Sequence, residues 1–386
     1  MNLTRKLLAG VTGALLWVHQ CDADERPKSR VQSLQKASKF IEHHDLQSAE
    51  ALLQPLVTRP SPDGIALNLL GLIRMQQQRP LDAKSLFERA IDVNPRIIGP
   101  RLNLAALYGS AQPFEAIAQL KRVIEIAPNN PGGQTLLIRI AKESSFEAAR
   151  SGDKLKSLEI LTKTRDVIPG NAELLYEFGL AALDAGSLQE AQRALEKLLQ
   201  MQPGSLNAHY ALARVLLEES NAQQAEGEMR RYLAAKPDDA TAHYGLGYIL
   251  SAEQKTVEAR AEFEKSLALE PKQTESLFSL GEIELEEGRQ MEAREWFGKV
   301  LAIDPNHAGA LTGVGIVEYR TGNYSDARSA FEHAISGAPS YQKAHYYYAL
   351  TLLKLDLKVD SEREFEISKK LQKPHGGLPN PEGSRP

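Results

Sequence analysis

The chain has 386 residues, of which 25% are charged and 42% are hydrophobic, as is usual for a soluble protein. Its formal net charge is −4 and it contains no long basic run, so a broad nucleic-acid-binding surface is not expected. The single cysteine, Cys21, excludes an internal disulfide framework and a cysteine-based zinc cluster.

The first segment, residues 1–23, has two basic residues followed by an apolar run over residues 7–18. This run is short for a bilayer span and is typical of a secretory signal peptide, with cleavage after Ala23. We therefore expect export to the periplasm or cell envelope. Two alternatives remain open: a membrane or lipid anchor in residues 1–21, with Cys21 lipidated, and a cytoplasmic chain. Residues 24–29 are polar and predict a flexible linker.

A repeat with a period of about 34 residues organises the rest of the chain. Six prolines recur at intervals of 34 residues from Pro169 to Pro339. From Pro203 on, each proline is preceded by a glycine or alanine 24 residues earlier, by an alanine 12 residues earlier and by a large apolar residue 8 residues earlier. Apolar residues between them are spaced by three and four, which predicts helices rather than strands. Each unit is therefore expected to be two helices, and Gly281 and Gly315 should lie where the two helices of a unit meet. The prolines are Pro169, Pro203, Pro237, Pro271, Pro305 and Pro339.

This pattern resembles the tetratricopeptide repeat family, whose units are helix pairs of about 34 residues. One unit reads AHYGLGYILSAEQKTVEARAEFEKSLALEP, residues 242–271. The chain departs from the family at His209, His243 and His345, where the family often has tryptophan. The resemblance implies an all-α fold, a right-handed superhelical α-solenoid of about ten units.

The predicted array covers residues 30–374, and residues 375–386 are expected to form a disordered tail. One unit is a residue short near Gly109, and another has seven extra residues around 142–154 that fit either longer helices or a protruding loop. The predicted units are 30–63, 64–97, 98–130, 131–171, 172–205, 206–239, 240–273, 274–307, 308–341 and 342–374.

No arrangement of residues typical of an active site is found, so no enzyme, catalytic residue, cofactor or metal is expected. The glycines lack the lysine–serine or lysine–threonine pair of a phosphate-binding loop. His209 and His243 lack the carboxylate spacing of a metal site and are interpreted as packing residues. The acidic run Glu282, Glu284, Glu286 and Glu287 is interpreted as a solvent-exposed helix face.

A mainly aromatic stripe runs along the first helices of successive units. Its rings recur once per repeat, and further members lie one helical turn away on the same face. The resemblance implies that this stripe lines the concave groove in which the family commonly binds extended peptides. The alternative is that the rings only pack between helices. The candidate ligand-binding residues are Tyr176, Tyr210, Arg214, Tyr244, Tyr248, Phe278, Glu282 and Tyr346.

These observations predict a binding scaffold whose partner is a protein or peptide in the groove. No nucleic acid is expected, and membrane association is expected only through the N-terminal segment. The alternative function is a carbohydrate-handling adaptor of an envelope polysaccharide secretion or assembly system, because tyrosine ladders also stack on sugars.

Overall fold

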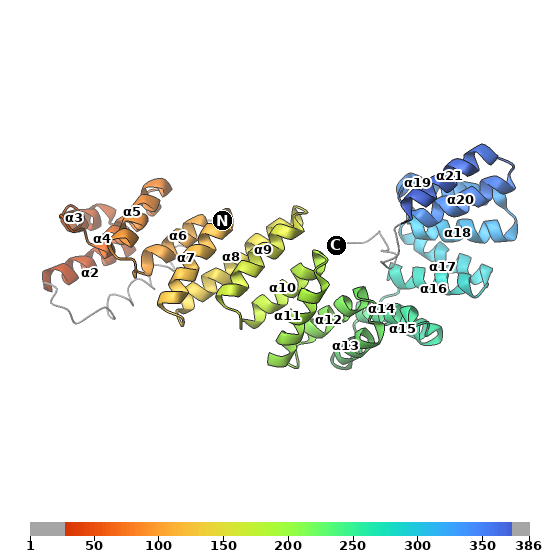
Figure 1. The fold of residues 1–386 in the computed structure, drawn as a ribbon, viewed down its shortest axis with the longest axis horizontal. Coiled ribbons are helices and arrows are strands. Elements are labelled where there is room, and N and C mark those ends of the chain that lie inside the picture. The colour runs from red at the N-terminus through yellow and green to blue at the C-terminus, as the bar shows by residue number, and fades with distance from the viewer. Residues whose placement is uncertain (1–27, 373–386) are drawn as a thin grey trace. The chain divides into compact units, whose positions relative to one another are not determined.

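The computed structural model of the protein describes residues 28–372, which contain twenty α-helices and no strand (Figure 1). The predicted signal segment 1–23 and tail 375–386 lie outside these residues. The helices follow one another as ten pairs, each joined by a short turn. The all-α array of about ten helix pairs expected from the sequence is confirmed.

The chain divides into two compact units, residues 1–194 and 195–386, and the boundary falls within α11 (Leu188–Met201). In the first unit each helix packs against the next from α2 to α10. Its helices are α2 (Lys28–Glu42), α3 (Leu46–Val57), α4 (Gly64–Gln76), α5 (Pro80–Val93), α6 (Gly99–Tyr108), α7 (Pro113–Ile126), α8 (Pro131–Arg150), α9 (Lys154–Val167) and α10 (Ala172–Asp184).

The second unit contains five further pairs, and its first helices α14, α16, α18 and α20 contact one another in sequence. Residues at the same register of these helices therefore lie on one shared face. Its helices are α12 (Leu206–Glu218), α13 (Ala222–Ala235), α14 (Ala240–Ala252), α15 (Thr256–Leu269), α16 (Thr274–Glu286), α17 (Gln290–Ile303), α18 (Ala308–Thr321), α19 (Tyr324–Gly337), α20 (Gln342–Lys354) and α21 (Lys358–Leu371).

A glycine on the first helix faces a phenylalanine on the second helix in four of the pairs. A Cβ atom on Gly281 would lie 2.6 Å from Cε1 of Phe297, and one on Gly315 would lie 2.6 Å from Cε1 of Phe331. Both rings are fully buried, so the helices approach closely only because these positions lack a side chain. The expected positions of Gly281 and Gly315 are confirmed. The equivalent pairs are Gly71 with Phe87 and Gly247 with Phe263.

The turn between the two helices of a pair contains a residue with positive φ at a fixed place. In the last six pairs this residue recurs once per repeat, with φ between 60° and 86°. Glycine adopts this left-handed conformation without strain, whereas other residues pay a steric cost. Three of the six positions are not glycine. The six residues are Gly186, Ser220, Gln254, Gly288, Gly322 and Asp356.

The seven extra residues of the irregular pair lie within a helix. α8 has 20 residues, whereas the first helices α10, α12, α14 and α16 each have 13. The extension is therefore two additional helical turns rather than a protruding loop.

Ion pairs between consecutive pairs of helices correct the interpretation of the acidic run on α16. Glu284 is only 4% exposed, and its carboxylate binds Arg260 of α15 and Arg289 in the turn after α16. Glu287 is bound by the same two arginines. The prediction of a solvent-exposed face was wrong for Glu284, because the neighbouring helix α15 brings Arg260 over it, whereas Glu286 is exposed.

Candidate functional site

The second unit holds seven of the eight predicted ligand-binding residues on four of its first helices. Tyr176 lies on α10 of the first unit. The others are Tyr210 and Arg214 on α12, Tyr244 and Tyr248 on α14, Phe278 and Glu282 on α16, and Tyr346 on α20.

Four rings of the stripe in this unit recur at the same register of their first helices. Each of them lies against an aromatic ring on the second helix of its own pair. The centroids of Tyr244 and Phe263 are 5.9 Å apart, and those of Phe278 and Phe297 are 5.8 Å apart. Packing between helices therefore accounts for at least one edge of each ring, and the ring of Phe278 also lies 5.2 Å from that of His307 in the next pair. Within residues 195–372, no ring of the stripe stacks on the corresponding ring of the next first helix. The remaining pairs are Tyr210 with Tyr232 and Tyr346 with Phe365, at 5.2 and 5.9 Å.

Three tyrosine hydroxyls of the stripe have no hydrogen-bond partner among the described residues. They belong to Tyr210, Tyr244 and Tyr248, whose side chains are half-buried. Burial raises the pKa of all three phenols. By contrast, the nearby Tyr232 hydroxyl donates to Oδ2 of Asp239 at 2.7 Å. These hydroxyls are not among the buried unpaired polar atoms of the described residues, so they remain accessible to a bound molecule.

Charges of both signs lie beside these rings. Arg214 is exposed and makes no hydrogen bond or ion pair with any residue that the structure describes. Its charge acts against the burial that raises the pKa of Tyr210. The charge of Glu218 adds to the effect of burial on the pKa of Tyr248, and the charge of Glu275 does the same for Tyr244. The face therefore places the cation of Arg214 and the carboxylates of Glu218 and Glu275 close to the tyrosines.

The stripe is interrupted at α18. Thr312 takes the place of the ring there, is only 1% exposed, and donates its hydroxyl to the carbonyl of Ala308 at 2.7 Å. An ion pair joins the first helices on either side of α18: Nζ of Lys343 on α20 binds Oε2 of Glu282 on α16 at 2.8 Å. Burial, together with the charge of Glu282, raises the pKa of Tyr341 to about 12. The side chain of Glu282 is therefore already engaged, and Tyr346 is separated from the rings on α14 and α16.

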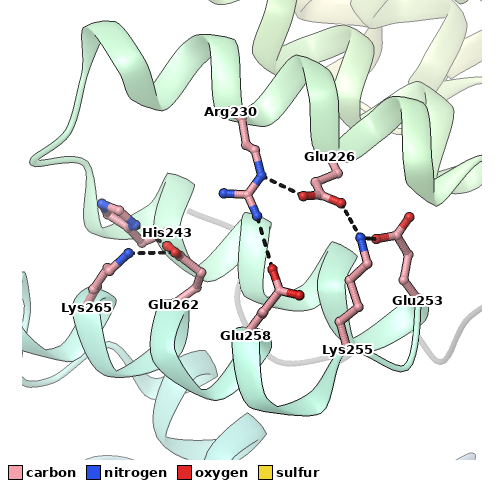
Figure 2. Close-up of polar contacts among 8 residues, drawn as sticks. All are labelled: Glu226, Arg230, His243, Glu253, Lys255, Glu258, Glu262 and Lys265. Carbon is pink, nitrogen blue, oxygen red and sulfur yellow. Dashed lines mark hydrogen bonds and ion pairs between the residues drawn. The ribbon is translucent and has the colours of Figure 1, made fainter.

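Three histidines at the start of first helices make a recurring contact. The sequence interpretation described two of them, His209 and His243, only as packing residues. Nδ1 of His243 lies 2.6 Å from Oε2 of Glu262 (Figure 2). Its Nε2 lies 2.9 Å from the carbonyl oxygen of Pro237. The signal that could have found this contact is a glutamate at a fixed spacing after each histidine, on the second helix of the same pair. The other examples are His209 with Glu228 and Pro203, and His345 with Glu364 and Pro339.

An ion-pair network joins α13 to the start of α15 on the second helices of neighbouring pairs (Figure 2). Lys255 binds Glu226 at 2.7 Å and Glu253 at 2.8 Å, while Arg230 binds Glu226 at 2.6 Å and Glu258 at 3.5 Å. Hydrogen bonds from Lys255 and Arg230 lower the pKa of Glu226 to about 2. Charges of opposite sign are paired across the network, so it fastens neighbouring helix pairs.

Within residues 28–372, no three histidine, cysteine or acidic side chains are grouped closely enough to hold a metal ion. The helices of the same part of the chain include none with the length and apolar character needed to cross a bilayer.

Two family models, both described as tetratricopeptide repeat, match the chain. One matches residues 182–247, and the other matches residues 34–96, 244–308 and 315–366. Together these segments cover more than half of the sequence. No curated protein sequence matches the chain.

Among solved structures, the Cut9–Hcn1 hetero-tetramer of the APC/C shares 15% identity with a TM-score of 0.52, covering 89% of this chain and 81% of that chain. Yeast Tom70 shares 12% identity with a TM-score of 0.46, covering 90% and 93%. MamA from Desulfovibrio magneticus RS-1 shares 24% identity with a TM-score of 0.41, covering 44% and 96%. The likeness to Cut9–Hcn1 shows a common fold.

Proposed function

The chain belongs to the tetratricopeptide repeat family, and from this premise we propose that it is a non-enzymatic scaffold for a partner protein. The partner contributes an extended segment that lies across the first helices α12, α14 and α16. Tyr210, Arg214, Tyr244, Tyr248 and Phe278 form the central contacts.

The observation that carries this proposal is the unpartnered hydroxyl of Tyr244, together with those of Tyr210 and Tyr248. The rings of Tyr210 and Tyr244 are fixed on one edge by the second helices, so little side-chain entropy is lost when a ligand binds. An extended polypeptide presents carbonyl and amide groups at regular intervals, which suits hydroxyls that both donate and accept.

The charges on this face suggest what the bound segment contains. Arg214 is exposed and has no partner among residues 28–372, and a guanidinium binds carboxylates through paired hydrogen bonds. An acidic side chain or a C-terminal carboxylate would meet it, while apolar groups of the segment would cover the exposed edges of the rings. The Lys343–Glu282 ion pair marks the end of the surface beyond α16, so the segment spans three first helices.

A peptide selection tests this function directly. A library of short random peptides displayed on phage would be selected against the chain, and enriched peptides would be measured by fluorescence polarisation. Arg214→Ala should weaken the binding of acidic peptides about tenfold or more, because a charge-assisted contact is lost. Arg193→Ala, which removes an exposed arginine from α11, serves as the matched control.

Two outcomes would contradict the proposal: enrichment of no peptide, or enriched peptides that bind both arginine variants equally. A parallel glycan array decides the alternative of a carbohydrate-handling adaptor, since binding to glycans without binding to peptides would establish it.

The cellular location is part of the same proposal. The basic and apolar opening of residues 1–23 supports export to the cell envelope, with an anchor in residues 1–21 as the alternative. N-terminal sequencing of native material tests this. A mature end near Asp24 in the envelope fraction is expected, lipid on Cys21 would establish the anchor, and an intact Met1 in the cytoplasm would refute export.

A further inference from the structure

Two tyrosines at the centre of the stripe form a pair of neighbouring rings. The centroids of Tyr244 and Tyr248 on α14 are 6.2 Å apart, and their planes are inclined by 39°. The ring of Tyr244 also lies 5.9 Å from that of Phe263 on α15, which holds the pair in place. The pair therefore presents two phenolic hydroxyls close together on one helix face.

The repeat register brings an acidic side chain to this pair from the preceding first helix. Arg214 on α12 and Tyr248 on α14 occupy the same position of successive first helices. Glu218 follows Arg214 by one helical turn, so it lies on the same face, one turn from the position that corresponds to Tyr248. On the other side of α14, Glu275 lies in the first turn of α16, three residues before Phe278. Carboxylates from both neighbouring first helices therefore flank the two tyrosines.

The electrostatic coupling of these groups agrees with this placement. Burial raises the pKa of Tyr248, and the charge of Glu218 adds to the effect. Burial likewise raises the pKa of Tyr244, with further contributions from Tyr248 and from the charge of Glu275. Because the effect of a charge on another group decreases with distance, both carboxylates are near the rings.

The fold does not use the carboxylate of Glu218 or the two phenolic hydroxyls. Glu218 is exposed and makes no hydrogen bond or ion pair with any residue in the range 28–372, including Arg214 one turn away. Within the same residues, the lysine and arginine side chains that lie over aromatic rings all lie over rings other than Tyr244 and Tyr248. A carboxylate and two hydroxyl oxygens beside aromatic rings therefore remain available to a ligand.

This set of groups favours a positively charged ligand group. Carboxylate and phenolic oxygens accept hydrogen bonds from an ammonium or a guanidinium group, and an aromatic ring attracts a cation to its face. The long alkyl part of a lysine or arginine side chain would also pack against the rings while its charge meets the carboxylate. A neutral side chain of the same length would gain only the apolar contact.

We propose that Glu218, Tyr244 and Tyr248 form a subsite for a basic side chain, a lysine or an arginine, of the bound segment. The inference rests on the proposed function and adds a requirement to it. The segment must carry a positive charge for this subsite as well as the acidic group that Arg214 binds. Because Arg214 and Glu218 lie one helical turn apart on α12, the two opposite charges also fix the direction in which the segment lies.

Nuclear magnetic resonance with single amino-acid probes tests the subsite without a selected peptide. The full chain would carry ¹³C-labelled tyrosine rings, and the variants Tyr244→Phe and Tyr248→Phe would assign the two signals. The probe is Nα-acetyl-lysine amide, and the control is Nα-acetyl-norleucine amide, which has an alkyl side chain without the ammonium group. The lysine probe should shift both signals in a saturable manner, with a dissociation constant about fivefold or more below that of the norleucine probe.

Two substitutions remove the same charge from different places. Glu218→Gln should weaken the binding of the lysine probe about fivefold, because the carboxylate of the subsite is lost. Glu264→Gln removes an exposed carboxylate of α15 that has no partner in the described part of the chain, and it should change the binding by less than about twofold. Arg214→Ala should strengthen the binding of the lysine probe, because it removes a charge of the same sign.

Equal binding of the lysine and norleucine probes, or equal effects of Glu218→Gln and Glu264→Gln, would overturn the proposal. These outcomes are distinct from a failure of the proposed function. If acidic peptides bind through Arg214 but the lysine probe does not bind, only the subsite is refuted. If the lysine probe binds while no peptide is enriched, the subsite stands as a site for a cation and the peptide segment is refuted.

Discussion

The ring of Phe297 on α17 fills the space beside Gly281 on α16, so there is no room for a side chain on the glycine. A Cβ on Gly281 would lie 2.6 Å from the ring, which is fully buried and is also approached closely by the backbone of Gly313. Gly281→Ala should therefore lower the free energy of unfolding by about 1–3 kcal/mol through overpacking. Thermal and urea denaturation measure this loss.

Gly298 on α17 provides the matched control. It lies in a helix, is exposed, and has no atom within 4 Å of the position of a Cβ. Gly298→Ala should raise stability by about 0.5–1 kcal/mol, because alanine favours the helix. Replacement by alanine should therefore lower the free energy of unfolding at Gly281 and raise it at Gly298. A loss of stability of similar size at both sites would disprove the close contact.

The left-handed residue in the turns between paired helices gives a second prediction. Gln254 has φ +62°, at the register where Gly288 and Gly322 occur. Gln254→Gly should stabilise the chain by about 0.5–1 kcal/mol by removing steric strain. Glu264→Gly, in the exposed middle of α15, should instead cost about 1 kcal/mol. Differential scanning calorimetry separates the two, and destabilisation by Gln254→Gly would show that the turn is not strained.

The ion pairs of Glu284 predict a loss of stability in acid. Burial acts to raise the pKa of Glu284, but hydrogen bonds from Arg289 and Arg260 outweigh it, so the net pKa is lowered. A carboxylate with a lowered pKa contributes stability above its unfolded pKa of about 4.3 and loses that contribution as the pH falls. Glu284→Gln should cost about 1–3 kcal/mol at neutral pH and reduce the dependence of stability on pH below about 5.

Glu286→Gln is the control for this prediction, because Glu286 is exposed and has no partner in the described part of the chain. It should leave the neutral-pH stability within about 0.5 kcal/mol of the unaltered chain. Equal effects of the two substitutions on urea midpoints at neutral pH would instead support a uniformly solvent-exposed face.

The repeat was predictable because its packing constraints recur at fixed intervals. Gly281 and Phe297 belong to one unit, so their contact follows from the helical period and the repeat register alone. The burial of Glu284 depends on Arg260 in the preceding unit. A run of four glutamates on one helix cannot show which carboxylate the neighbouring helix covers.

The sequence predicted which residues of the candidate site share a face, but it did not predict which side chains they contact. The period placed Tyr210, Tyr244 and Phe278 on one face, but the packing of each ring depends on an aromatic partner in the second helix of its pair. The interruption at α18 follows from the sequence, because Thr312 occupies the ring position there. The Lys343–Glu282 ion pair could not be derived, because it joins two first helices across an intervening helix pair.

The central claim is that the hydroxyls of the stripe serve a ligand rather than the fold. Isothermal titration of one selected peptide, with urea denaturation of the same samples, should be compared for Tyr244→Phe and Tyr232→Phe. Because the Tyr244 hydroxyl has no partner among the described residues, its removal should leave stability unchanged and weaken binding about tenfold. Tyr232→Phe should cost about 1 kcal/mol of stability, because its hydroxyl binds Asp239, and leave binding unchanged. If Tyr244→Phe lowers stability and leaves peptide affinity intact, the claim is contradicted.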